Sequence, residues 1–171
     1  MENPQPKRKH PHLKEYDYSQ NGCYFVTICT FERQQLFDTY SVGRDLCVPP
    51  TAATQIAVKW MKELEIKYPT CRIEKAVIMP NHIHMIVALG TGDAAAHTGA
   101  ALPRIMQWYK TMTTNAYIRG VKSGILLPFR KTLWQTSFYD HVIRNEADYL
   151  RIWQYIDTNP AKWVEDEYYT I

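Results

Sequence analysis

The chain has 171 residues, of which 46% are hydrophobic and 22% charged, as in an ordinary globular domain with a sizeable core. No apolar run is long enough to span a bilayer, so the composition excludes a helical membrane protein, and the basic N-terminus lacks the apolar segment of a secretory signal. The net charge of +3 comes from the first fourteen residues, where four cations stand against one acid.

The basic N-terminal stretch is expected to be separate from the domain. Residues 1–17 are predicted to form a flexible, proline-rich arm, and residues 18–171 a single domain. Lys7, Arg8 and Lys9 in this arm suit contact with a phosphate backbone. A solubilising tail has the same composition, so both interpretations stay open.

The cysteines indicate the compartment. The chain has four of them, and none forms a C-x-x-C pair. Free thiols in a reducing environment are the simplest interpretation, and we therefore expect a cytoplasmic protein.

The first half of the chain shows the pattern of one strand, one helix and one hairpin. Residues 22–31 are β-branched and aromatic, which is typical of a strand. Residues 51–69 carry apolar side chains at helical spacing. Residues 71–80 and 82–89 are predicted to be two strands, and the turn signal Pro80-Asn81 between them makes them a hairpin.

The second half adds a helix, a strand and a last helix. Helical spacing covers residues 103–120, and residues 133–143 are strand-like. The segment 145–160 is predicted to form a helix that is capped by Asn145 and stops before Pro160. The order β-α-β-β-α-β-α predicts an α+β fold of the ferredoxin-like, or RRM-like, kind. We expect an antiparallel sheet with helices packed on one face and an extra C-terminal helix.

Two histidines interrupt the apolar strand that follows the turn. Side chains alternate across a strand, so His82 and His84 share one face with Ile86. Two imidazoles at adjacent positions on one face can ligate one cation together and leave the rest of its coordination sphere open to a substrate. The alternative is a pair of histidines on the solvent face of a half-buried strand.

A tyrosine on the last helix lies away from the apolar stripe. With 100° per residue, Tyr149, Trp153 and Ile156 cluster on the core side, whereas Tyr155 is about 120–160° away from the two aromatic residues. A tyrosine on a polar face can act as a nucleophile. A surface tyrosine without a chemical role would have the same pattern.

Taken together, these segments resemble a known family. The chain is similar to the HUH single-tyrosine transposases, and within them to the REP-associated tyrosine transposases. The matching segments are GCYFVTICTFERQQLF, VIMPNHIHMIV, LWQTSFYDHVIRNEADYL and YIDTNPAKW, which span most of the chain from about Tyr18 to Trp163.

The resemblance implies a catalytic site. In the family, two histidines bind a divalent metal and a tyrosine on a late helix attacks DNA, which implies metal ligands at His82 and His84 and a nucleophile at Tyr155. A polar residue four positions after the tyrosine often completes the metal site, which implies Asn159. The metal would be Mg²⁺ or Mn²⁺, and the mixed ligand set suits Mn²⁺ at least as well.

The implied reaction is cleavage and strand transfer on single-stranded DNA that folds into a hairpin, through a covalent 5′-phosphotyrosine. Cations of the arm (Lys7, Arg8, Lys9) and of the second helix would bind DNA. The candidates on that helix are Arg104, Lys110 and Arg119.

Two alternatives to this enzyme remain. A non-cleaving module that binds hairpin DNA or RNA would keep the fold without the chemistry, although it would have no chemical need for His82, His84 and Tyr155 together. A structural zinc site is poorly supported, because no cysteine lies near the histidines in the sequence.

The protein is expected to act as a monomer if Tyr155 lies beside the histidines of its own chain, and as a homodimer with shared sites if it does not.

Overall fold

The structure is a computed structural model that describes residues 22–43, 49–90 and 102–168. The predicted arm, with Lys7, Arg8 and Lys9, lies outside the described residues.

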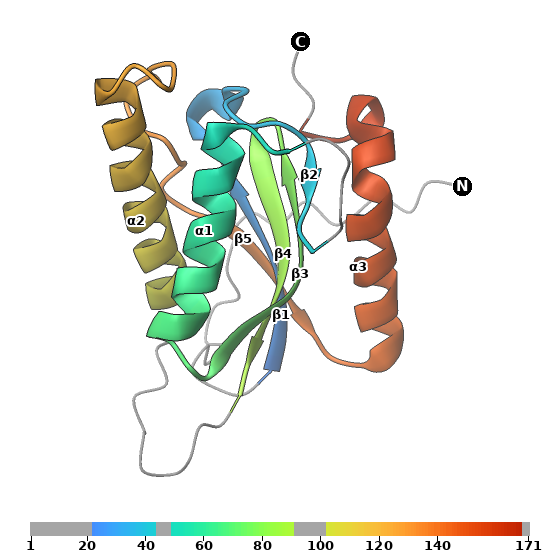
Figure 1. The fold of residues 1–171 in the computed structure, drawn as a ribbon. Coiled ribbons are helices and arrows are strands. Elements are labelled where there is room, and N and C mark those ends of the chain that lie inside the picture. The colour runs from blue at the N-terminus through green and yellow to red at the C-terminus, as the bar shows by residue number, and fades with distance from the viewer. Residues whose placement is uncertain (1–21, 44–48, 91–101, 169–171) are drawn as a thin grey trace.

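One antiparallel sheet forms the centre of the molecule, with the strand order β2-β3-β4-β1-β5 (Figure 1). The strands are β1 (Gly22–Cys29), β2 (Tyr40–Ser41), β3 (Cys71–Met79), β4 (His82–Leu89) and β5 (Tyr139–Ile143). Only the turn Pro80-Asn81 separates β3 from β4, so the predicted hairpin is confirmed. The hairpin places the start of β4 beside the end of β1, where His82 pairs with Cys29.

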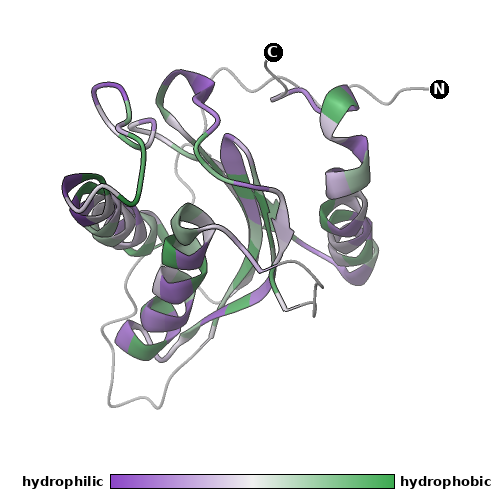
Figure 2. Cartoon of the chain, turned by 45° about the horizontal axis from the view of Figure 1, so that its top comes forward, coloured by the Kyte–Doolittle hydropathy of each residue, from purple (hydrophilic) through white to green (hydrophobic). Residues whose placement is uncertain are grey.

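Three helices pack on this sheet: α1 (Ala52–Lys67), α2 (Leu102–Lys122) and α3 (Glu146–Thr158). Helices α1 and α2 cover one face, and α3 covers the other (Figure 1); the second view in Figure 2 shows the same three layers. The predicted α+β sandwich is confirmed, and its extra C-terminal helix lies on the opposite face of the sheet. None of the described helices combines the length and apolar character needed to cross a membrane.

Strand alternation divides the interior into two cores. On β4, Ile83, Met85 and Val87 point into the large core under α1 and α2. Ile86 points to the other side, into a smaller core with Ile152 of α3. His82 and His84 share the face of Ile86, as the period of two predicts, and therefore lie on the α3 side.

Helix α3 is capped at its start and joined to the sheet near its end. At its start, Asn145 Oδ1 accepts a hydrogen bond from the backbone N–H of Asp148 at 2.9 Å, as an N-cap does. Near its end, Lys75 Nζ on β3 lies 2.6 Å from Asp157 Oδ1. Between them, the buried Ile156 fixes the rotation of the helix, and this rotation decides where Tyr155 points.

The strand predicted over residues 133–143 forms only in its second half. Lys110 Nζ donates to three successive carbonyl oxygens, those of Gln135 at 2.9 Å, Thr136 at 3.2 Å and Ser137 at 2.8 Å. Successive carbonyl groups of an extended strand point to opposite sides, so three that converge on one ammonium group require a chain that is not extended, and residues 135–137 form a loop before β5 begins.

Three further elements were not predicted, and one is the three-residue 3-10 turn η1 (Phe31–Arg33) that follows β1. Strand β2 has only two residues, too few for a pattern to show. Helix α3 ends at Thr158, before Pro160 as predicted, and the chain then continues as a 3-10 turn, η2 (Asn159–Glu165). Pro160 is tolerated at the start of η2 because the N–H that it lacks would have no partner there.

The packing of α3 gives a first prediction. Replacing Ile156, which is 1% exposed, by alanine should reduce the free energy of unfolding by about 2–5 kcal/mol, since a buried side chain is lost and a cavity remains. Leu150→Ala, at a position 56% exposed on the same helix, should change it by less than about 0.5 kcal/mol. Urea unfolding measures both, and equal losses would contradict the assigned rotation of α3.

Candidate functional site

The two histidines lie inside the protein, at the start of β4. Their side chains are buried, with 0% of His82 and 1% of His84 exposed. This burial excludes the alternative in which both histidines lie on the solvent face of the strand. Their Nε2 atoms are only 3.0 Å apart. The two imidazole nitrogens therefore converge on one point on the α3 side of the sheet.

The neighbouring residues orient both rings. Asn81 Nδ2 donates to the carbonyl oxygen of Tyr168 at 2.7 Å, which turns its Oδ1 toward His82. His82 Nδ1 lies 2.8 Å from that oxygen and must carry the proton, so the lone pair of His82 is on Nε2. His84 Nδ1 lies 2.7 Å from Thr27 Oγ1 on β1. Outer partners of this kind are typical of histidines that bind metals.

Burial keeps both rings neutral. It lowers the pKa of His82 to about 3, and the positive charge of Arg33 acts in the same direction. Burial also holds the pKa of His84 well below its usual range, with His82 as the second cause. The neutral imidazole is the form that donates a lone pair to a metal ion, so neither ring has to lose a proton near pH 7.

Tyr155 of α3 completes this cluster within one chain. Its Oη lies 3.3 Å from His84 Nε2, and 37% of the residue remains exposed. Burial raises the pKa of Tyr155, the charges of Asp166 and Glu167 raise it further, and the amide of Asn159 opposes them. The phenol is therefore protonated at neutral pH and needs added positive charge before it can act as a nucleophile.

An acid lies near the two rings, and an amide is hydrogen-bonded to this acid. Asp166 Oδ2 lies 4.0 Å from His82 Nε2, and ligand atoms of Asp166, His82 and His84 lie within 4.8 Å of one another. Asn159 Nδ2 donates to Asp166 Oδ2 at 2.8 Å, while Asn159 Oδ1 is buried without a hydrogen-bond partner among the described residues. A buried carbonyl oxygen without a hydrogen-bond partner is costly, and a bound cation can supply the missing interaction.

Sequence patterns do not indicate Asp166. It follows the 3-10 turn η2, in a segment with no period that assigns its side chain to a face. The structure reveals its place in the site through its approach to His82, the hydrogen bond from Asn159 and that from the backbone N–H of Tyr168 at 2.7 Å.

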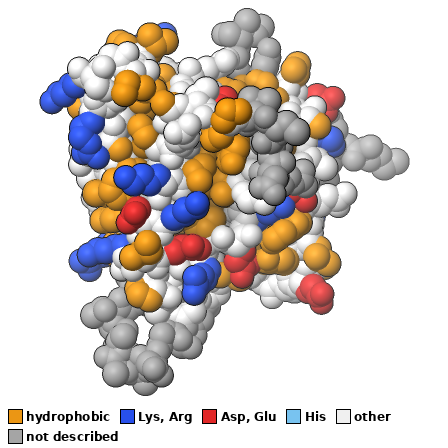
Figure 3. Space-filling view, viewed as in Figure 1, with side chains coloured by type: hydrophobic (Ala, Val, Ile, Leu, Met, Phe, Trp, Pro, Cys, Tyr) orange, Lys and Arg blue, Asp and Glu red, His pale blue; other side chains and the backbone are white. Residues whose placement is uncertain are grey.

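The predicted DNA contacts of the second helix lie across the sheet from this site. Arg104 and Arg119 are exposed on α2, and Figure 3 shows Lys and Arg side chains spread over the face that α1 and α2 form. Lys110 is different, because its ammonium group holds the three carbonyls of residues 135–137 and burial lowers its pKa to about 8. Contact of Arg104, Lys110 and Arg119 with DNA stays a prediction.

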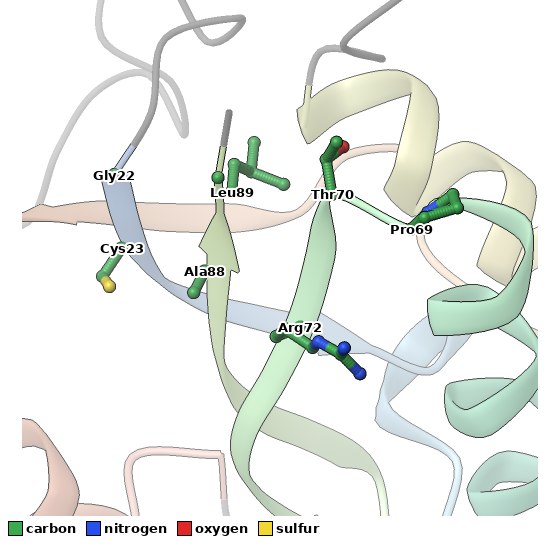
Figure 4. Close-up of a pocket in the computed structure, with 8 residues that line it drawn as sticks. Gly22, Cys23, Pro69, Thr70, Arg72, Ala88 and Leu89 are labelled. Atoms are coloured by element: carbon green, nitrogen blue, oxygen red, sulfur yellow. The ribbon is translucent and has the colours of Figure 1, made fainter. Parts of the chain in front are cut away.

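A separate cavity of about 390 Å³ lies at the other end of the sheet (Figure 4). Residues at the start of β1 and at the end of β4, where Gly22 pairs with Leu89, line this cavity together with Arg72 of β3. His82 is at the opposite end of β4, so this cavity is not part of the histidine site.

Comparisons with known proteins agree with the geometry. The model of the family described as "Transposase IS200 like" matches residues 19–159. An uncharacterized protein of Haemophilus influenzae is 29% identical over 170 residues, which are 95% of this chain and 93% of that protein. The REP-associated tyrosine transposase of Escherichia coli is 30% identical over 91 residues, which are 52% of this chain and 45% of that protein.

A solved structure is also similar. It shows a REP-associated tyrosine transposase bound to a REP hairpin, and it matches with a TM-score of 0.59 and 25% identity over 89% of this chain and 73% of that one. The resemblance stated from the sequence motifs is thereby confirmed.

The orientation of His82 gives a second prediction. In metal-free protein, the proton of the neutral ring should be on Nδ1, because Asn81 Oδ1 accepts it. Nitrogen-15 NMR of histidine-labelled protein treated with a chelator measures this, with His82→Gln to assign the signal. A ring protonated on Nε2 would contradict the orientation, and Asn81→Ala should weaken the preference for Nδ1.

Proposed function

The chain belongs to the family of IS200-like transposases, and from this membership we propose that it cuts and rejoins single-stranded DNA beside a hairpin. The observation that carries the proposal is the place of Tyr155, whose Oη lies 3.3 Å from His84 Nε2 of the same chain. Hairpin DNA as the substrate is supported by the solved relative, which was bound to a REP hairpin. The domain would comprise residues 18–171, with residues 1–17 as a DNA-contacting arm.

The donor set fits a divalent metal, Mg²⁺ or Mn²⁺. His82 and His84 would supply their Nε2 atoms, Asp166 a carboxylate oxygen and Asn159 the buried Oδ1 that no described group satisfies. Two nitrogens and two oxygens suit Mn²⁺ as well as Mg²⁺. When bound, the ion supplies positive charge that stabilises the scissile phosphate and lowers the pKa of the attacking phenol.

The residues of the chain perform the bond exchange. Tyr155 Oη attacks the phosphorus in line, a bond forms between them, and the bond from phosphorus to the 3′ oxygen breaks, which leaves a 5′-phosphotyrosine and a free 3′-OH. A 3′-OH of the same or another strand then attacks the phosphotyrosine and releases Tyr155. Each step exchanges one phosphate ester for another, so the reaction needs no ATP.

The phenolic proton of Tyr155 starts 3.3 Å from His84 Nε2. When that nitrogen holds an ion, the proton leaves to solvent on the exposed side of Tyr155.

The place of Tyr155 also supports action as a monomer. The tyrosine and both histidines come together within one chain, so a complete site needs no residue from a second copy. Arg104 and Arg119 remain proposed DNA contacts. Lys110 acts first through the loop that it holds, so its substitution would weaken DNA binding by disordering residues 135–137.

The nucleophile gives a third prediction. Incubation with a labelled single-stranded hairpin and Mn²⁺ should give a covalent protein–DNA band, and Tyr155→Phe should abolish it while DNA binding is retained. Tyr149→Phe is the matched control on the same helix, because Tyr149 instead donates to Glu74 of β3, and this variant should form the band. Tight binding by the wild type with no band would favour the non-cleaving module.

The metal site gives a fourth prediction. Asp166→Asn and Asn159→Ala should each weaken Mn²⁺ binding by more than about tenfold, the loss that even outer partners of a metal site cause. Electron paramagnetic resonance of free Mn²⁺ measures the affinity. Asp157→Asn, which removes the partner of Lys75 on the same helix, should leave it unchanged. Unchanged affinity in both site variants would exclude the two oxygens as ligands.

A further inference from the structure

Strand β5 lies at one edge of the sheet (Figure 1), and its first residue is Tyr139. Of the described tyrosines, Tyr139 is the most exposed, at 44%, and Tyr155 follows at 37%. Tyrosine is common in strands, so this exposure alone does not indicate a function. The position of Tyr139 on the sheet does.

The register of the strands places Tyr139 in the same row as the histidine site. His84 of β4 pairs with Thr27 of β1, and Thr27 in turn pairs with Tyr139. Residues that lie directly opposite each other on neighbouring strands share a face, so Tyr139 points to the face that carries His84. Because neighbouring strands lie about 4.8 Å apart, the backbone of Tyr139 is about 10 Å from that of His84.

The ring of Tyr139 lies at the end of a group of aromatic rings. Its centre is 6.5 Å from the ring centre of Tyr168, and Tyr168 packs against His82 and His84 at 4.7 Å and 5.8 Å. The ring centre of Tyr155 lies 5.3 Å from that of His84. Tyr168 is only 8% exposed and both histidines are buried, so Tyr139 and Tyr155 are the two rings of this group that a ligand can reach.

The next residue of β5 on this face holds the edge of the sheet to helix α3. His141 pairs with Phe25 of β1, and its Nε2 lies 2.7 Å from Asp148 Oδ2 on α3. The ring of Phe25 packs against that of Tyr155 at 5.8 Å in an edge-to-face arrangement. These contacts keep Tyr155 at a fixed position relative to the edge strand that carries Tyr139.

We propose that Tyr139 stacks on a nucleobase of the DNA strand close to the scissile phosphate and thereby fixes where the strand lies over Tyr155. Every base has a π-face, so an exposed aromatic ring binds single-stranded DNA with little regard to its sequence. The span of about 10 Å between the backbones of Tyr139 and His84 corresponds to about three steps of 3.4 Å along a DNA strand. The stacked base therefore lies within about three nucleotides of the phosphate that Tyr155 attacks. The proposal rests on the proposed function of Tyr155.

The salt dependence of binding distinguishes stacking from a phosphate contact. In the Tyr155→Phe background, binding of a hairpin oligodeoxynucleotide with single-stranded arms is measured over a range of salt concentrations. Tyr139→Leu should weaken binding by about tenfold, as expected for the loss of one stacked base, and should leave the slope of log K against log salt unchanged. Tyr139→Phe and Tyr139→Trp should keep the affinity, because they retain a ring. Leu150→Ala, at an exposed position of α3 about 140° from Tyr155 around the helix, is the control and should change neither quantity.

Abasic sites in the DNA locate the stacked base. They replace the nucleotides of the single-stranded arms one at a time. At one position the abasic site should reproduce the loss caused by Tyr139→Leu and add nothing to it, and this position should lie within about three nucleotides of the cleavage point mapped with the wild type. Each of the four bases at that position should support a similar affinity, because stacking tolerates all of them.

Three results would overturn the proposal. The first is an affinity of Tyr139→Leu equal to that of its parent, and the second is a set of losses that add at every abasic position. The third is a loss in Tyr139→Phe as large as that in Tyr139→Leu, which would assign the contact to the hydroxyl group and not to the ring.

Two controls separate this proposal from other failures. Melting temperatures establish that the variants fold, and a photochemical crosslink needs no variant of Tyr139. When 5-iodouracil at the located position is irradiated in the complex, it should attach to Tyr139, and attachment only to other residues would contradict the proposal. If the wild type binds the hairpin but forms no covalent band, the proposed function of Tyr155 fails, while the binding experiments still report on Tyr139 because they need no cleavage.

Discussion

The close approach of two buried, neutral imidazole nitrogens is the constraint on which the rest of the site depends. His82 Nε2 and His84 Nε2 lie 3.0 Å apart, and the proton of His82 is committed to Asn81 on the other side of its ring. Two lone pairs directed at one point in a region of low dielectric are costly unless a proton or a cation lies between them. A carboxylate oxygen of Asp166 lies near the same point, and Asn159 donates to that carboxylate, so the two lone pairs have an acid and not a second cation beside them.

The fold supplies this arrangement through simple geometry. A turn of two residues starts β4 at His82, and the period of two sends both histidines to the face that α1 and α2 leave open. Helix α3 covers that face, and Ile156 in the smaller core leaves the adjacent Tyr155 at the border between protein and solvent. Tyr155 is thus buried enough to contact His84 and exposed enough to reach a DNA strand.

The sequence predicts the parts of the site that lie on regular elements. Strand alternation assigns His82 and His84 to one face, and helical geometry separates Tyr155 from the apolar stripe, as the structure has them. Asp166 escapes prediction because it lies in a segment after a 3-10 turn, where no period assigns side chains to a face. The bonds of Lys110 to three carbonyls depend on a loop some 25 residues away in the chain, and a charge pattern cannot distinguish such a lysine from one that binds DNA.

The central claim is that one chain holds a complete cleavage site. It is tested most directly by mixing two inactive proteins, the Tyr155→Phe variant and a variant with alanine at both His82 and His84. If each chain needs its own tyrosine beside its own histidines, the mixture forms no covalent protein–DNA band under conditions in which the wild type does. A band restored in the mixture would show that tyrosine and histidines from different chains cooperate, and would contradict the account.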